Sequence, residues 1–384
     1  MIPFRITKRA LTRQYHSLPL LDTNELVLKG IPTEGTVAGR DYMEWASIRE
    51  LGNRNFFAPR SRAQRQLLPS ISQYEEILAH CMARWLLVDY KLNSFPYFDL
   101  NIVTVYTDLH QSLRMSRSIL NYYAKTVPED LYQRVNCYLL PLHNNNVQEN
   151  MKVSVPDSKI TVLQDGILST SPSFFIEDPV YVIMANDVLR HLSQDYVRRV
   201  DSTWEQRYLD FYEQGTRHQR FSKTLDYWCN VTLDTLASEL DASGLQETYI
   251  PTRLVQLFYL LQHCAPEHKL LAFDAAQGSE SLSVMRQVHS WFSPQKETFR
   301  ASQPYGPQDP LNSDEATSFV SNFTELRKIY AAVGNGAKVC QSKSLDDFAR
   351  DWSDIEETEC ILGVSDLGTR TQWMRDASIG VLHA

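Results

Sequence analysis

Glycine is missing from a long part of this chain, although the sequence has 14 glycines among its 384 residues. None lies between Gly52 and Gly166. Loops that hold a nucleotide phosphate through backbone N–H groups rely on glycine, because a β-carbon would stand in the way of the ligand. We therefore expect no glycine-rich phosphate loop in this stretch. The Walker pattern and the nucleophile elbow of many hydrolases are absent from the whole sequence.

Cysteine is sparse, and its spacing is not that of a metal site or a disulfide framework. The six cysteines form no Cys-x-x-Cys pair. His263 and Cys264 with His268 come nearest to a ligand cluster, but Pro266 interrupts any helix that would join them. We expect no disulfide and no metal. Apolar runs long enough to cross a bilayer are also missing, so no transmembrane role is expected.

Acidic residues are absent from the start of the chain until Asp22. The first fifteen residues, MIPFRITKRALTRQY, interleave four basic residues with apolar ones. This bias is typical of a mitochondrial presequence, and the Arg13-Gln14-Tyr15 triplet predicts cleavage after Tyr15. We therefore expect residues 1–15 to direct the protein to the mitochondrial matrix. The alternative is a disordered basic tail without a targeting role.

Positive charge is scarce in the remainder of the chain. Removing residues 1–15 takes away four positive charges and no negative one, so the formal charge falls from −8 to −12. Binding to a phosphate backbone needs clustered Lys and Arg, so nucleic acid is not expected as a partner. A local basic stretch contains Arg54, Arg60, Arg62 and Arg65, which we interpret as a solvated face.

The spacing of apolar residues predicts an α/β fold. A capping box at Ser72-Gln73-Tyr74-Glu75 indicates a helix that runs to about Leu92. A buried strand follows at 102–106, then a helix at 113–124 and a strand at 135–142. This order is typical of a doubly wound, mostly parallel sheet. Further strands are expected at 160–163, 180–185 and 270–273.

The other segments have weaker patterns. Residues 16–71 are expected to form an N-terminal connection with a short helix from Asp41, and residues 72–384 the main domain. Within that domain, the charged and aromatic residues of about 194–241 predict a helical insertion. Proline-rich residues 275–318 predict an extended connection. Apolar stripes at 319–330 and from Ser344 predict C-terminal helices.

Several ordered segments of this chain resemble the MidA-like family of mitochondrial S-adenosylmethionine-dependent protein-arginine methyltransferases, and its fungal branch most closely. The likeness is spread over most of residues 35–382. The most specific stretches are YIPTRLVQLFYLLQHCAPEHKLLAFD at 249–274 and FVSNFTELRKIYAAV at 319–333. The resemblance implies a class I methyltransferase-like fold with a helical insertion and C-terminal helices.

The resemblance also implies a cofactor site, and this sequence departs from it. The family has an acid and a glycine-rich turn after its first strand, and a second acid after the next strand to bind the ribose. Here Thr104 replaces the first acid, and Pro141 stands at the position of the second. The turn itself reads Tyr106-Thr107-Asp108-Leu109-His110 and has no glycine. We expect its bulky side chains to fill the cofactor volume, so that no cofactor is bound.

The family's signature after a later strand is partly kept. Asn186-Asp187-Val188-Leu189-Arg190-His191 retains one acid at Asp187, whereas Arg190 stands where a second acid would be. Asp187 and His191 are therefore the candidates for catalysis. The alternative interpretation of Asp187 is a strand-end residue that caps the following helix.

Three functions follow from these observations. The first is a catalytically inactive member of the family that binds a mitochondrial protein and assists assembly of a respiratory complex. The second is an active protein-arginine methyltransferase with an atypical site for S-adenosylmethionine. The third is a structural or assembly factor of the mitochondrial ribosome, which the acidic surface favours only for a contact with protein.

Overall fold

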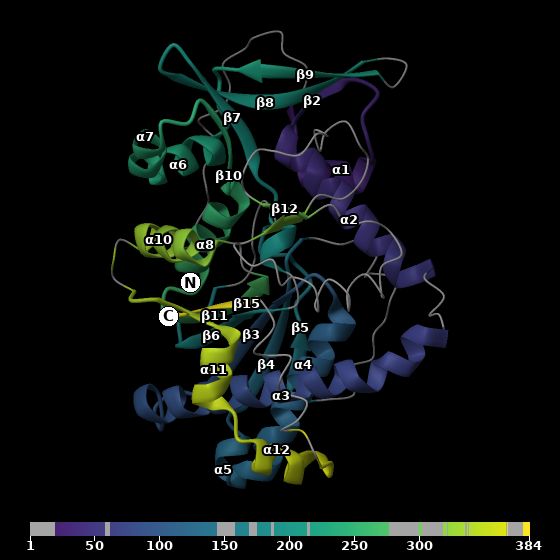
Figure 1. Ribbon diagram of the computed structural model, residues 1–384, viewed down its shortest axis with the longest axis vertical. Helices are drawn as coiled ribbons and strands as arrows, with labels where there is room; N and C mark the ends of the chain where they lie inside the picture. Colours follow the sequence, from purple (N-terminus) through teal and green to yellow (C-terminus); the bar gives the residue numbers. More distant parts are fainter. Residues whose placement is uncertain are drawn as a thin grey trace.

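In the computed structural model, the chain folds into two large sheets with helices packed around them (Figure 1). It describes residues 20–57, 62–143, 158–168, 175–185, 188–212, 216–275, 299–301, 318–320, 322–334, 336, 338–365, 367 and 379–384. Most of the predicted connection at 275–318 and the predicted presequence at 1–15 therefore lie outside the described residues.

The larger sheet is the doubly wound, mostly parallel sheet that the sequence predicted. Its strand order is β14-β15-β11-β6-β3-β4-β5, and only β15 runs against the other strands. The central strands are buried on both faces, as β-branched runs between two helical layers must be. The bounds are β3 Leu100–Tyr106, β4 Val135–Pro141, β5 Ile160–Val162, β6 Val180–Met184, β11 His268–Ala275, β14 Gln341–Ser344 and β15 Ile379–His383.

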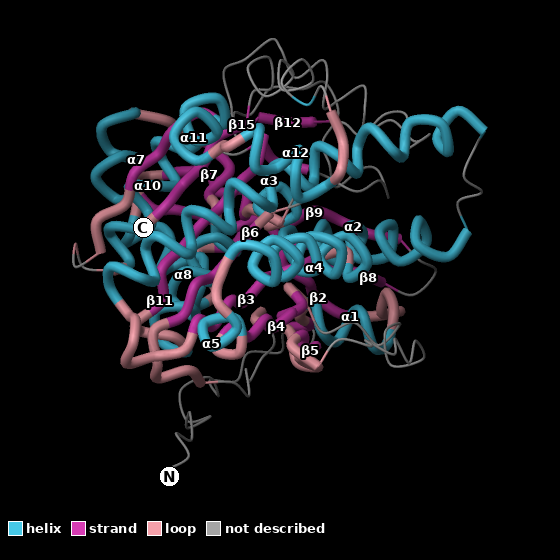
Figure 2. The backbone as a smooth tube through the Cα atoms, turned by 90° about the horizontal axis from the view of Figure 1, so that it is seen from below, coloured by secondary structure: helices cyan, strands magenta, loops and turns pink. Residues whose placement is uncertain are grey.

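Helices cover both faces of this sheet. One face packs against α3, α4 and α11, and the other against α6, α8 and α10. Figure 2 shows α3 and α4 side by side, in agreement with their close packing (Figure 2). Within the part of the chain described, no helix combines the length and apolarity needed to cross a membrane. The bounds are α3 Arg62–Asn93, α4 Leu109–Thr126, α5 Glu129–Tyr132, α6 Tyr227–Thr235, α7 Ala237–Ser243, α8 Thr252–Cys264, α10 Phe323–Val333, α11 Leu345–Trp352 and α12 Ile355–Leu362.

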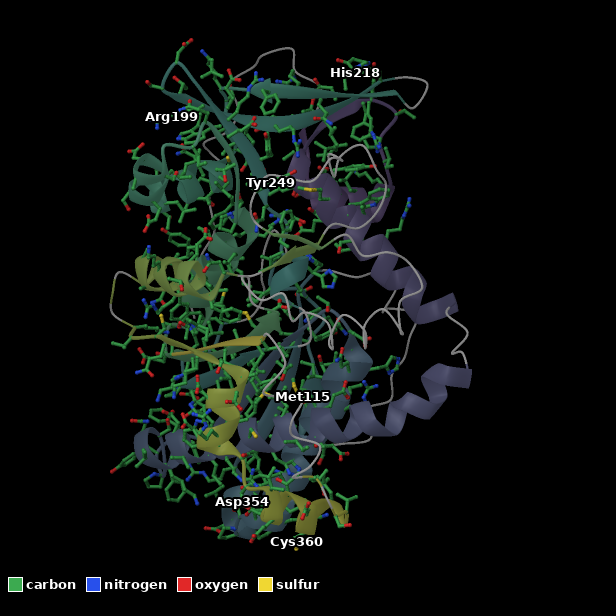
Figure 3. The ribbon with its side chains drawn as sticks, in the orientation of Figure 1. Met115, Arg199, His218, Tyr249, Asp354 and Cys360 are labelled. Atoms are coloured by element: carbon green, nitrogen blue, oxygen red, sulfur yellow. The ribbon has the colours of Figure 1, made fainter. Side chains whose placement is uncertain are left out.

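The smaller sheet joins the start of the chain to its middle. Its order is β1-β2-β8-β7-β10, and β9 pairs with residues 206–212 of β8. Figure 3 shows Arg199 and His218 at this end of the molecule, and Asp354 and Cys360 at the opposite end (Figure 3). The bounds are β1 Leu20–Leu21, α1 Thr23–Lys29, β2 Gly35–Ala38, α2 Gly39–Phe57, β7 Asp195–Val200, β8 Thr203–Tyr212, β9 Thr216–Ser222 and β10 Glu247–Ile250; a separate pair is β12 Phe299–Ala301 with β13 Ser318–Val320.

The predicted helical insertion at 194–241 is wrong in its first half. Residues 195–200, 203–212 and 216–222 form strands, and the next helix begins at Tyr227. Trp204, Tyr208 and Tyr212 are spaced by four residues, which places side chains on one side of a strand as well as of a helix. Asp201 and Ser202 both have positive φ, at 50° and 64°, and form the tight turn between β7 and β8.

The capping box expected at Ser72 is also not a helix start. Helix α3 begins at Arg62 and continues through residues 72–75. The residues between 62 and 71 are mostly Arg, Ala, Gln and Leu, which favour helix and extend it in the N-terminal direction. The predicted start of the later helix also moves, because 318–320 pair as β13 and α10 begins at Phe323 with Asn322 as its cap.

Candidate functional site

The order of strands defines one edge of the larger sheet as the place where a ligand binds. From β3 the chain proceeds to β4 and β5 on one side, and from β6 to β11 on the other. In open parallel sheets, ligands bind outside the carboxyl ends of the strands where this direction reverses. The candidate site therefore lies at the ends of β3, β4 and β6, and the sequence predicted residues at each of these ends.

The turn after β3 is short and is organised by Asp108. The Asp108 carboxylate accepts a hydrogen bond from the backbone N–H of Gln111 at 3.1 Å and caps α4, which starts at Leu109. Thr107 and Asp108 are half-buried, and Thr104 is fully buried within the strand. This turn contains no glycine, and its one carboxylate, that of Asp108, is used to cap α4. The residues present do not fit the glycine-lined mode of holding an adenosyl group.

Two of the bulky side chains of this turn are buried in the core. Tyr106 and Leu109 are buried in the hydrophobic cluster beneath α3 and α4, on the same side as Ile102. His110 is exposed on α4. Successive strand residues point to opposite faces, so Tyr106 is directed into the core. The expectation that these three side chains fill the cofactor volume is not supported by their packing.

Helix α2 brings polar groups to the end of β4. Pro141 is buried as the last residue of β4, and His143 follows two residues later. His143 Nε2 lies 3.5 Å from Glu44 Oε1, and that oxygen has no hydrogen-bond partner within the described residues. Burial lowers the pKa of His143, although Glu44 opposes this. A carboxylate from α2 thus approaches the strand whose own acid is missing.

The end of β6 is only partly described. Asn186 and Asp187 lie outside the described residues, as does the side chain of Arg190. His191 ends the short 3₁₀ helix η2, Leu189–His191, and is 8% exposed. Its Nδ1 lies 3.0 Å from the Ser47 hydroxyl of α2. Of the two catalytic candidates, the structure places His191 in a buried contact with α2, and Asp187 stays a prediction.

A buried ionic cluster attaches α2 to the rest of the molecule, and the sequence gave no sign of it. Arg40 donates to Asp195 at 2.5 Å and to Asp226 at 2.8 Å. Arg253, at the start of α8, contacts Asp41 and lies 2.7 Å from Glu44. These partners come from separated segments, so no local motif could reveal them.

The balance of charge in this cluster sets the pKa of each member. Burial raises the pKa of Asp195 and of Asp41, and the neighbouring arginines only partly oppose it. Burial alone would also raise the pKa of Glu44, but Arg253 and His143 outweigh it and the pKa is lowered. Within the residues described, no group of His, Cys, Asp and Glu has the arrangement of a metal site.

The fold and the site together define a class: an open, doubly wound α/β protein with a ligand edge formed by three parallel strands. The family model of a putative S-adenosyl-L-methionine-dependent methyltransferase matches residues 81–334, and the chain belongs to this family.

Comparison with known proteins gives one similar sequence and several weakly similar solved structures. The chain is similar to the protein arginine methyltransferase NDUFAF7 homolog, mitochondrial, of Saccharomyces cerevisiae, with 28% identity over 90% of this chain and 89% of the relative. A solved methyltransferase-like protein from Burkholderia thailandensis, bound to S-adenosyl-homocysteine, covers 80% of this chain and 76% of its own with 12% identity and a TM-score of 0.45. The plantazolicin methyltransferase BpumL, also in complex with that product, gives a TM-score of 0.35 at 9% identity, over 89% and 98% of the two chains.

The expectation that the chain takes no cofactor is therefore wrong. The family to which it belongs is described as S-adenosylmethionine-dependent. The packing gives the physical reason, because Tyr106 and Leu109 are turned into the core and do not occupy the edge. The sequence does show that the turn after β3 has no glycine and that β4 ends without an acid.

Proposed function

We propose that this chain is a mitochondrial S-adenosylmethionine-dependent methyltransferase that acts on arginine side chains of a protein. The observation that carries the proposal is the reversal of strand order between β3 and β6, with the polar face of α2 over the ends of β4 and β6. Membership of the methyltransferase family supports the cofactor. The similar yeast protein, named as a mitochondrial protein arginine methyltransferase, supports the substrate and the location.

The cofactor contacts at this edge differ from the family pattern. S-adenosylmethionine supplies the methyl group when bound. The groups of this chain near the carboxyl edge are the half-buried Thr107, the Glu44 carboxylate with His143, and Ser47 with His191. We propose that polar side chains of α2 take the place of the missing acid of β4.

A second function is favoured by the turn after β3. Its lack of a glycine and of a free carboxylate removes contacts that hold the cofactor for reaction. A protein with this turn binds its partner without transferring a methyl group at a useful rate. We propose this as the alternative, with a role in assembly of a mitochondrial respiratory complex. A contact with the mitochondrial ribosome has no observation in its favour.

The first experiment measures binding of S-adenosylmethionine and S-adenosylhomocysteine to the whole chain by calorimetry. We expect saturable binding in the micromolar range. Thr107→Trp, which adds bulk at the carboxyl edge, should weaken binding at least tenfold. Tyr97→Trp is the matched control, because Tyr97 is 86% exposed just before β3, at the opposite edge.

Methyl transfer then separates the two functions. Incubation with S-adenosylmethionine labelled in the methyl group and a mitochondrial protein extract should label arginine in a specific protein. Binding without labelling would favour the alternative. Absence of saturable binding, or equal binding by the Thr107→Trp variant, would contradict a cofactor site at this edge.

A further inference from the structure

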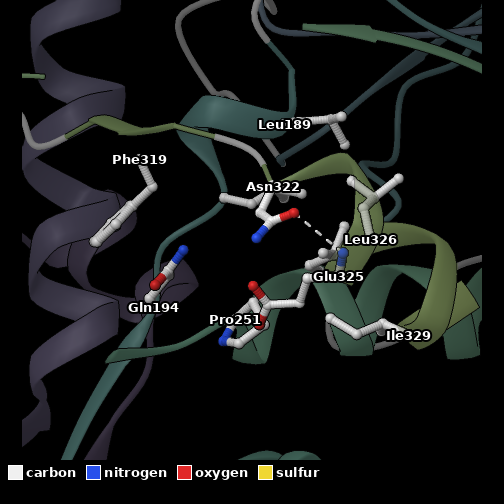
Figure 4. Close-up of a pocket in the computed structure, with 10 residues that line it drawn as sticks. Leu189, Gln194, Pro251, Phe319, Asn322, Glu325, Leu326 and Ile329 are labelled. Carbon is white, nitrogen blue, oxygen red and sulfur yellow. Dashed lines mark hydrogen bonds between the residues drawn. The ribbon is translucent and has the colours of Figure 1, made fainter. Parts of the chain in front are cut away.

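A small pocket lies next to η2, and Figure 4 shows the residues that line it. It is formed by η2, the start of β7, the start of α8 and the first turns of α10, and its volume is about 40 Å³. Its walls are mostly apolar, with Leu189, Leu326 and Ile329 among them. This volume is too small for a nucleoside and suits the end of one side chain. The pocket begins a few residues after the carboxyl end of β6.

One wall of the pocket carries an acceptor that has no donor. Gln194 is 7% exposed, and its Oε1 is buried without a hydrogen-bond partner among the residues described. A buried carbonyl oxygen left without a donor is costly, and such atoms are uncommon in folded proteins. Figure 4 shows Gln194 facing the interior of the pocket across from Glu325 (Figure 4). A ligand that donates a hydrogen bond would satisfy this oxygen.

The opposite wall carries a negative charge. The Glu325 carboxylate points into the pocket from the first turn of α10 (Figure 4). Burial raises its pKa, and the nearby Glu239 adds to this, while Lys328 opposes it. Lys328 lies 3.9 Å from Glu239, so these two charges offset each other and Glu325 leaves the pocket negative. Asn322 Oδ1 accepts from the backbone N–H of Glu325 at 3.3 Å, which fixes the start of α10.

We propose that this pocket binds the guanidinium group of an arginine side chain. The guanidinium presents several donors in one plane, which matches a carboxylate on one wall and an amide oxygen on the other. The aliphatic stem of arginine packs against the apolar walls, as it does elsewhere in proteins. The Glu325 carboxylate disfavours an anion in this pocket. The inference rests on the proposed function in one respect only: it assigns this pocket to the arginine that would be methylated.

The test is a titration of the whole protein, without cofactor, with Nα-acetyl-argininamide, monitored by the methyl NMR signals of isoleucine and leucine. The signals of Ile329 and Leu189 should shift, and arginine should bind at least fivefold more tightly than the neutral Nα-acetyl-citrullinamide. Glu325→Gln should remove this preference. Glu356→Gln, which changes an exposed glutamate on α12, should retain it.

Thermal unfolding distinguishes loss of the ligand site from loss of the fold. The raised pKa of Glu325 means that its ionised form destabilises the folded state above about pH 4.5, its ordinary value. Glu325→Gln should therefore be at least as stable as the unmodified protein at pH 7.5. A variant that is stable but no longer prefers arginine supports the proposal.

Equal binding of arginine and citrulline, or an unchanged preference in Glu325→Gln, would overturn the inference. Tighter binding of Nα-acetyl-lysinamide than of the arginine compound would also overturn it. None of these measurements involves S-adenosylmethionine. Failure here would leave methyl transfer open to its own test, and failure of cofactor binding would leave the arginine pocket in place.

Discussion

Arg40 lies buried at the point where α2 meets β7 and α6, with three carboxylates around it. It contacts Asp195 and Asp226 directly, and Asp41 lies 3.8 Å away. Burying an arginine and its carboxylates costs solvation free energy, and only close ion pairing compensates for this cost. The raised pKa of Asp195, caused by burial, shows that the compensation is incomplete. This residue therefore controls how firmly the N-terminal helices are held over the site.

Replacing Arg40 with methionine should destabilise the protein by about 3 to 5 kcal/mol near pH 8, because it leaves buried carboxylates without a partner. The pKa of Asp195 is already raised by burial, and loss of Arg40 raises it further. An acid with a raised folded pKa costs stability as pH rises through that pKa. The loss should therefore be smaller at pH 5 than at pH 8, as measured by urea unfolding at both values.

The control is Arg350→Met, which removes an exposed pair with Asp346 on α11. Its free energy of unfolding should change by no more than about 0.5 kcal/mol. An equally small change for Arg40→Met, or a loss that grows toward pH 5, would show that the buried cluster is not what holds α2.

At the scale of elements, strands β3, β4, β5, β6 and β11 of the larger sheet were predictable from sequence, whereas its strands β14 and β15 and the smaller sheet were not. Strands β3, β4, β6 and β11 are buried on both faces, so each appears as a short apolar run. Strands β7 and β8 have mixed polar and aromatic residues whose spacing suits helix equally well. Strand β1 has two residues and β15 has five, which is too little sequence for a periodic signal.

The residues of the candidate site were likewise predictable in part. The turn after β3 and Pro141 lie at the carboxyl ends of β3 and β4, which a parallel sheet brings to one edge, while Thr104 lies within β3; their role toward a cofactor stays a prediction. Glu44, Gln194 and Glu325 were missed, since each acquires its meaning from partners on distant elements. We expected the side chain of Tyr106 to lie in the cofactor volume, because the sequence alone does not show on which face of the sheet it packs.

Strand β15 gives a test at this scale. Gly380 lies opposite Asp274 of β11 and Ser344 of β14, and a β-carbon there would collide with the ring of Phe323 at the start of α10. Gly380→Ala should lower stability by about 1 to 3 kcal/mol, because the ring or the strand must move. Thermal unfolding measures this, with Ser342→Ala on the neighbouring strand as a control that should change little. An unchanged melting temperature in Gly380→Ala would mean that α10 is free to shift away from the sheet.

At the scale of the whole molecule, charge is distributed unevenly along the chain. Residues 1–15 carry four positive charges and no negative one, while the chain as a whole has a formal charge of −8. This segment lies outside the described residues. Its basic, acid-free composition and the similar yeast protein both favour a mitochondrial location.

Deleting residues 2–15 from a C-terminally tagged protein should abolish its arrival in mitochondria, because the basic amphipathic segment is lost. Fluorescence microscopy and protease protection of isolated mitochondria measure the location, and protection in the absence of outer membrane would indicate the matrix. The control is Arg350→Met, which removes an exposed basic residue outside this segment and should localise normally. Normal import of the shortened chain would contradict the presequence.

The pairing of β2 with β8 has a consequence for how the protein is made. Thr36 of β2 donates a hydrogen bond to Asp210 of β8, 174 residues further along the sequence. While the chain emerges from a ribosome or threads through a membrane pore, β2 and α2 have only their local neighbours β1 and α1 until that later strand follows. Contacts between such distant segments form slowly and expose apolar surface in the interval. Newly synthesised protein should depend on holding chaperones for longer than a domain of similar size built from local contacts.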